Sequence, residues 1–154
     1  MIIVECFADE FFVKCLGVSR KKIKHEGGKG KVLGLVKKQN KAAGLVDEDP
    51  GSIQPAEMNN YIQVESSETA KLFRRNNNNS LKVVQVTPYL EGWLIYRAKQ
   101  NGISPKNYDL PDDPKKMHSI PNIEKKPNFQ AFVKEIVEKD SEVQTIKSWI
   151  EEAI

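Results

Sequence analysis

Short apolar runs and helically spaced apolar residues alternate along the first third of the chain. Residues 2–4, IIV, form a β-branched run typical of a buried strand. Asp9 can open a helix whose apolar face ends at Gly17, a residue suited to a helix C-terminus. Residues 22–26 predict a second strand, and residues 32–41 predict a second amphipathic helix.

A third apolar strand, AAGLVD at residues 42–47, completes a strand, helix, strand, helix, strand pattern. Connections of this kind are crossovers, and they predict a parallel sheet with helices against its faces. Ligands of such sheets bind beyond the carboxyl ends of the strands. Glu5 and Asp47 follow or end the first and third strands, so we expect them to meet in one crevice if these strands are neighbours.

The middle of the chain predicts a β-hairpin. Residues 61–65 and 70–75 resemble short strands, NNNN at residues 76–79 has the composition of a turn, and LKVVQV at residues 81–86 is strongly strand-like. A helix over residues 89–100 then follows Thr87 and Pro88.

The C-terminal part predicts a pair of amphipathic helices within residues 128–154, the second begun by a capping box of Ser141 and Gln144. Their apolar stripes favour core packing over binding of a partner. Residues 103–127 hold five of the eight prolines and predict a loop. The expected fold is therefore α/β, a mostly parallel Rossmannoid sheet flanked by helices, in a single domain with its core over about residues 1–100.

Composition agrees with one soluble globular domain of 154 residues, with 39% apolar and 29% charged residues. Cys6 and Cys15 lack the spacing of a zinc site or a disulfide framework, so we expect buried free thiols. A signal peptide begins with a basic region, whereas the first twelve residues here hold Glu5 and no Lys or Arg. No apolar run approaches the roughly 20 residues of a membrane span. We expect a cytoplasmic protein with no membrane contact.

The net charge of +3 is too balanced to indicate a nucleic-acid binder by itself. The first 41 residues are clearly basic, which fits either a surface that faces phosphates or ordinary solvated lysines. The turn GGKGK at residues 27–31 matches neither a P-loop nor a dinucleotide-binding motif. Lys29 and Lys31 could still approach a substrate phosphate there, or the turn could be a plain connection.

Three adjacent carboxylates, Asp47, Glu48 and Asp49, follow the third strand directly. Like charges this close raise each other's pKa, so folding alone gives no reason to gather them. Hard divalent cations bind through one or two carboxylates together with waters and substrate phosphate oxygens. The pattern therefore predicts a Mg²⁺ or Mn²⁺ site, and the alternative is a solvated turn in an interaction domain.

The stretches IIVECFAD and GLVDEDPG resemble the TOPRIM fold of topoisomerases, bacterial primases, some small ribonucleases and overcoming-lysogenization-defect nucleases. That family has an apolar strand that ends in Glu and a later apolar strand that ends in Asp-x-Asp, with a Gly close behind. The matching residues are Glu5, Asp47, Asp49 and Gly51. The family commonly has Gly after the glutamate, where this chain has Cys6, and this departure puts catalysis in doubt more than the fold.

The stretch TPYLEGWLI has a weaker resemblance to stand-alone TOPRIM-like proteins of defence-related systems. It adds Glu91 as a further candidate metal ligand, although a Glu in the first turn of a helix is also favoured by the helix dipole. His118 lies between lysines and could contact phosphate or act as an acid, but a surface histidine is the favoured interpretation.

The resemblance implies a metal-dependent nuclease of nucleic acid, in which Glu5, Asp47 and Asp49 are catalytic and bind Mg²⁺ or Mn²⁺. Lys29 and Lys31 would then steer the phosphate backbone. The sequence leaves open whether the substrate is DNA or RNA. The alternative is a non-catalytic TOPRIM-like binding or regulatory subunit of a multi-protein complex such as a phage-defence system, partnered for example with an ATPase.

Overall fold

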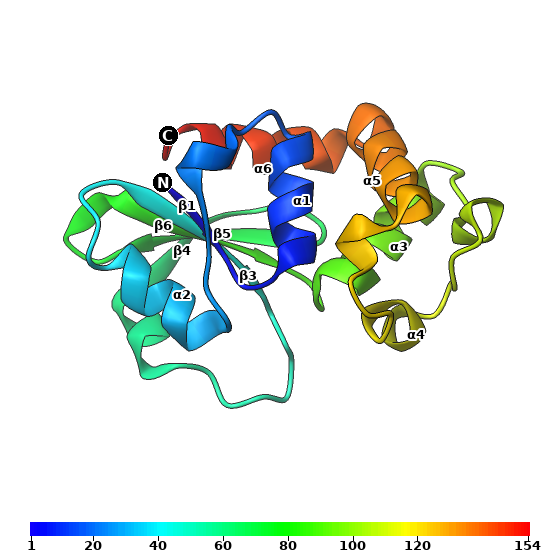
Figure 1. Cartoon of the computed structure of the whole chain (residues 1–154). Helices are drawn as coiled ribbons and strands as arrows, with labels where there is room; N and C mark the ends of the chain where they lie inside the picture. The colour runs from blue at the N-terminus through cyan, green and yellow to red at the C-terminus, as the bar shows by residue number, and fades with distance from the viewer.

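The computed structural model describes residues 1–154 and contains a six-stranded mixed sheet with helices on both sides (Figure 1). The strands are β1 (Ile2–Val4), β2 (Ile23–His25), β3 (Ala42–Asp47), β4 (Tyr61–Ser66), β5 (Ala70–Arg75) and β6 (Asn78–Val86). The helices are α1 (Phe7–Cys15), α2 (Lys29–Val36), α3 (Leu90–Gln100), α4 (Pro114–His118), α5 (Pro127–Lys139) and α6 (Ser141–Glu151). The prediction of an α/β fold with a C-terminal helical pair is confirmed.

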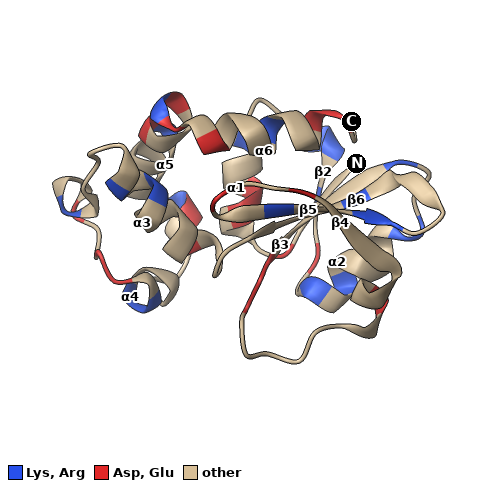
Figure 2. Ribbon diagram, turned by 180° about the vertical axis from the view of Figure 1, so that it is seen from behind, with Lys and Arg blue, Asp and Glu red and all other residues tan.

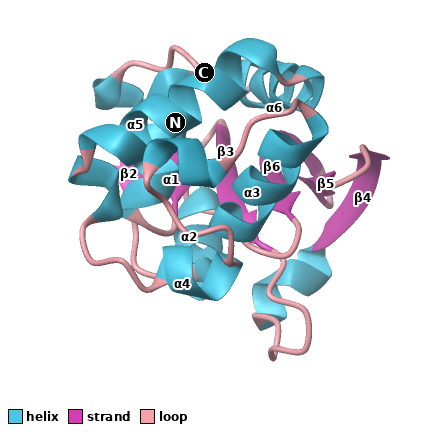
Figure 3. Ribbon diagram, turned by 90° about the vertical axis from the view of Figure 1, so that its right-hand side faces the viewer, coloured by secondary structure: helices cyan, strands magenta, loops and turns pink.

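The strand order is β2-β1-β3-β6-β5-β4, and β2, β1, β3 and β6 run parallel to one another. The first and third strands are neighbours, which meets the condition on which the predicted meeting of Glu5 and Asp47 depends. β5 and β4 are antiparallel additions beyond β6, so the predicted hairpin extends the same sheet. The register pairs Asp47 with Val86, which brings the carboxyl ends of β3 and β6 side by side. Figure 3 looks toward this end of the sheet and shows β4 at its outer edge.

The two faces of the sheet are covered unequally. The helix α2 covers one face, where its residues Val32, Leu33 and Val36 belong to a small apolar cluster of nine buried residues. The helices α1, α3, α5 and α6 contribute to a cluster of 31 buried residues that includes the other face. The central strand β3 is buried on both sides from Ala42 to Val46, because parallel strands in such a layered fold have no solvent face.

Two helices begin earlier than the sequence predicts. The helix α1 starts at Phe7 because Cys6 caps it: the backbone N–H of Asp9 donates to Cys6 Sγ, and the Cys6 N–H donates to the Asp9 carboxylate. A cysteine in this role is not a usual capping signal. The helix α2 starts at Lys29, so only residues 27–28 of the expected flexible turn precede it, and Gly28 has the positive φ of 124°.

The predicted loop over residues 103–127 contains short helices, and the prediction was wrong there. Pro105 and Pro114 each open a helical turn, since proline at the first helical position loses no hydrogen bond. The cap of α6 also differs from the expected capping box, because Asp140 accepts the Val143 N–H (3.1 Å). Within NNNN, residues 76–77 form the turn and β6 begins at Asn78.

Cys6 and Cys15 are free, as expected, but both are only partly buried. None of the helices combines the length and apolar character needed to cross a membrane.

Candidate functional site

The carboxyl ends of β1 and β3 bring Glu5 and Asp47 into direct contact. The backbone N–H of Asp47 donates to Glu5 Oε2 at 2.7 Å. The start of α3 adds a second constraint, because the Leu90 N–H donates to Asp47 Oδ1 at 2.9 Å. Three parallel strands, β1, β3 and β6, thus position these acids by their backbones, as the crossover pattern of the sequence predicts.

Two further buried acids stand close to this pair. Asp9, in the first turn of α1, is 2% exposed, and Glu91, in the first turn of α3, is 5% exposed. The charges of Glu5, Asp9 and Glu91 all raise the pKa of Asp47. Glu91 therefore lies near the other acids, as its place after a parallel strand predicts. Asp9 was missed as a candidate because it also fills a helix-capping position.

Burial dominates the electrostatics of this acidic group. Desolvation raises the pKa of Asp47 to about 9, and the neighbouring carboxylates add to the rise. Desolvation likewise raises the pKa of Asp9 to about 7, against hydrogen bonds from Cys6 that lower it. Burial also raises the pKa of Glu5, and the charge of Asp49 contributes. A nearby cation would oppose this rise, because its charge favours the ionised carboxylates.

The three consecutive acids after β3 point to different partners. Glu48 accepts from the Thr87 hydroxyl (3.1 Å) and pairs with Lys71 (3.6 Å). Asp47 and Asp49 instead line one pocket. Asp49 has a positive φ of 48°, and its N–H donates to the Pro88 carbonyl at 2.9 Å. Figure 2 shows this run of acids where β3 leaves the sheet. The middle acid thus anchors the loop, and the outer two line the pocket.

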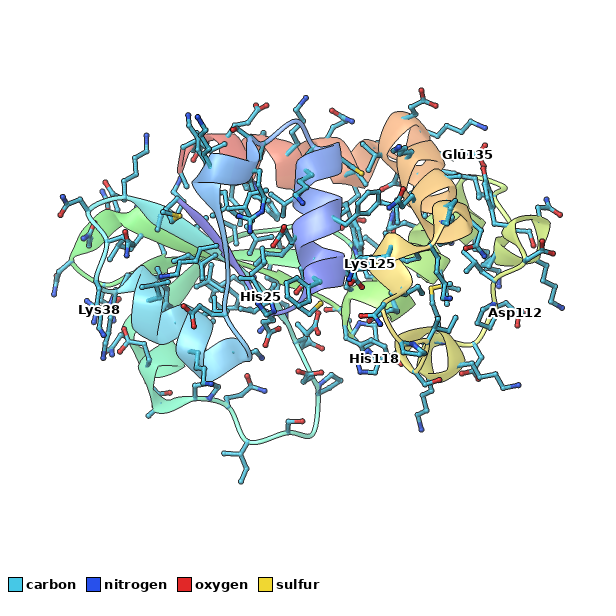
Figure 4. The ribbon with its side chains drawn as sticks, in the orientation of Figure 1. His25, Lys38, Asp112, His118, Lys125 and Glu135 are labelled. Carbon is cyan, nitrogen blue, oxygen red and sulfur yellow. The ribbon has the colours of Figure 1, made fainter.

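The pocket has a volume of about 360 Å³. Tyr89, Lys115 and His118 line it together with the two aspartates. Although 66% of the His118 side chain is exposed, its Nδ1 lies 3.2 Å from Glu91 Oε2, and its ring meets the Tyr89 ring edge-on at 5.6 Å. His118 is therefore a surface histidine that is tied to the acidic site (Figure 4).

The two lysines expected at the substrate do not line this pocket. Lys29 is only 8% exposed, and its ammonium donates to the Glu48 carbonyl (3.0 Å) and to Gln54 Oε1 (2.7 Å). Lys29 therefore stabilises the loop that carries the acids through its backbone and through Gln54. Lys31 is exposed beside Glu26 and Lys38, in a separate hollow. Nothing in the spacing of the sequence signals that Lys115, about 65 residues beyond the acids, shares their pocket.

The donor set suits a hard cation that shares its ligands with substrate and water. Carboxylate oxygens of Glu5, Asp47 and Asp49 are the type that Mg²⁺ and Mn²⁺ prefer. The structure gives no hydrogen bond to Asp47 Oδ2 within the chain, and Asp47 lines the open pocket. No group of three or more His, Cys, Asp or Glu side chains is arranged to hold a metal ion, so a cation at Asp47 would need ligands from outside the chain.

Comparisons with protein-family models, curated proteins and solved structures found no match to this chain.

Proposed function

We propose that this chain is a TOPRIM-like, divalent-metal-dependent phosphodiesterase that cleaves nucleic acid. The observation that supports it best is the pocket beyond the carboxyl ends of β1, β3 and β6. Asp47 and Asp49 line it together with Lys115 and His118, and Glu5, Asp9 and Glu91 lie close to Asp47. This combination suits a phosphodiester, because both a cation and hydrogen-bond donors can neutralise the charge on its oxygens.

In this proposal Glu5, Asp47 and Asp49 hold the cation, with Glu91 beside them. A bound Mg²⁺ or Mn²⁺ would supply positive charge to the scissile phosphate and to the leaving oxygen. Lys115 and His118 then orient the substrate by contact with its phosphate oxygens. Glu91 fixes the imidazole through its 3.2 Å contact with Nδ1. Lys29 keeps the acidic loop in place through the Glu48 carbonyl.

The test is a cleavage screen with single- and double-stranded DNA and RNA in Mg²⁺ and in Mn²⁺. We expect metal-dependent cleavage that falls by more than about 100-fold in Asp47→Asn and in Glu5→Gln. The control is Asp112→Asn, since Asp112 is an exposed acid paired with Lys106 away from the pocket. Full cleavage by both site variants would refute the assignment.

Cys6 favours a second candidate function. Its side chain occupies the position after the glutamate and caps α1 through Sγ, a contact that glycine could not make. A side chain at this point narrows the approach of a substrate to the backbone. The second candidate is therefore a non-catalytic TOPRIM-like subunit of a complex such as a defence system, with an ATPase as one kind of partner. It predicts a stable complex on co-purification and no cleavage with any metal.

A further inference from the structure

An aromatic pair, the exposed Phe7 and the partly buried His25, lies close in the chain to Glu5 and outside the apolar core. Phe7 opens α1 two residues after Glu5, and His25 ends β2, where it is paired with Val4 of β1. The pair therefore lies at the same end of the sheet as the acids. The two rings stack at 4.1 Å with an angle of 15° between their planes. Phe7 is 55% exposed and belongs to neither apolar cluster of the fold.

The other side of Phe7 faces a groove. Phe7 and Phe11 of α1 line it together with Asn122 and Lys125, which precede α5, and Gln130 of α5, and its volume is about 360 Å³. His25 is not part of that lining, so the imidazole backs the phenyl ring from outside the groove. In Figure 4, His25 and Lys125 lie on opposite sides of the N-terminal end of α1.

The groove offers the groups that an unpaired nucleotide needs. Phe7 presents a flat apolar surface, which stacks on any nucleobase. Asn122 and Gln130 carry amides that can bond to base edges. Lys125 has no ion-pair partner in the chain, whereas the Glu10 carboxylate in the same groove is already paired with Lys14 and Arg20 at 2.9 Å each. Glu124 is the remaining acid of the lining, so the groove has no strong net charge to repel a phosphate.

We propose that Phe7, backed by His25, is the stacking platform for an unpaired nucleobase of the substrate, so that the acidic site takes single-stranded nucleic acid. This inference rests on the proposed function and narrows its substrate class. A base within a duplex is already stacked on both faces and cannot stack on the Phe7 ring without being extruded. An unpaired base of DNA or RNA can do so directly.

The experiment measures binding in Ca²⁺ in place of Mg²⁺, with a short single-stranded oligonucleotide that carries 2-aminopurine. Matched DNA and RNA strands and the corresponding hairpin duplex are the other arms. We expect quenched 2-aminopurine fluorescence and affinity for at least one single strand about tenfold or more above the duplex. Phe7→Ala should remove the quenching and weaken binding about tenfold, and Phe7→Trp should restore both.

Tyr96→Ala is the matched control, because Tyr96 is an exposed aromatic residue (39%) on α3, outside the groove. Equal binding of duplex and single strands, unchanged binding by Phe7→Ala, or no binding of any nucleic acid would each overturn the inference. Cleavage that needs Asp47 while Phe7→Ala binds normally would refute the platform alone. Binding that needs Phe7 without cleavage in any metal would refute the nuclease and keep the platform.

Discussion

Replacing Asp47 by asparagine is expected to stabilise the metal-free protein at neutral pH but not in acid. Burial raises the pKa of Asp47 to about 9 in the folded chain, whereas an aspartate in an unfolded chain has a pKa near 4. Between these values the unfolded chain releases a proton that the folded chain keeps. The carboxyl therefore costs no stability below about pH 4, and its cost grows as the pH rises toward about 9.

The size of the effect follows from that interval. At pH 7 the solution is about three pH units above the unfolded pKa, and each unit corresponds to about 1.4 kcal/mol, so the cost is about 4 kcal/mol. This is an upper value because Asp47 also faces the open pocket. The asparagine oxygen can still accept the Leu90 N–H that Asp47 Oδ1 accepts at 2.9 Å. We expect a rise in Tm on the order of 10 °C at pH 7.

The assay is thermal unfolding followed by circular dichroism, in EDTA, at pH 4.5 and at pH 7. Asp112→Asn is the control, since the Asp112 side chain is 60% exposed, and its Tm should match that of the wild type at both pH values. The reasoning would be refuted if Asp47→Asn had a lower Tm than the wild type at pH 7 and the deficit were at least as large as at pH 4.5. That result would show that the buried carboxyl is not a destabilising charge.

Two further substitutions test the packing that supports the site. Arg97→Met should lower the free energy of unfolding by about 3–5 kcal/mol in urea titrations, because Asp140 (2.8 Å) and Glu142 (2.7 Å) would lose their buried partner. Lys99→Met on the same helix is the control and should have little effect, and equal losses in the two variants would contradict the prediction. Gly44→Ala should cost about 1–3 kcal/mol, since its Cβ would lie 2.9 Å from Val32 Cγ1. Val32→Ala should relieve much of that cost in the double variant, whereas Gly34→Ala, with open space around it, should be neutral or stabilising.

The parallel core and the meeting of Glu5 with Asp47 could be predicted because each depends on local signals. A β-branched run predicts a buried strand, and the right-handed crossover rule then brings the strand ends together. Lys115 and His118 could not be placed, because their approach to the acids depends on how a Pro-rich segment folds against α3. Lys29 was assigned to the substrate for its charge and its place in a Gly-rich turn, yet its buried ammonium donates to the Glu48 carbonyl. A sequence shows which groups are charged but not which charges are already paired.

The outer strand β4 has a consequence for handling the protein in solution. Its residues 62–66 are exposed, and Ile62 and Val64 present apolar side chains at 47% and 40% exposure. An edge strand with unpaired backbone groups and apolar side chains is a template on which further strands can add. Aggregation at high concentration would therefore start at this hairpin, on the far side of the sheet from β2. A lysine at position 64 would protect that edge without touching the acids or the Phe7 groove.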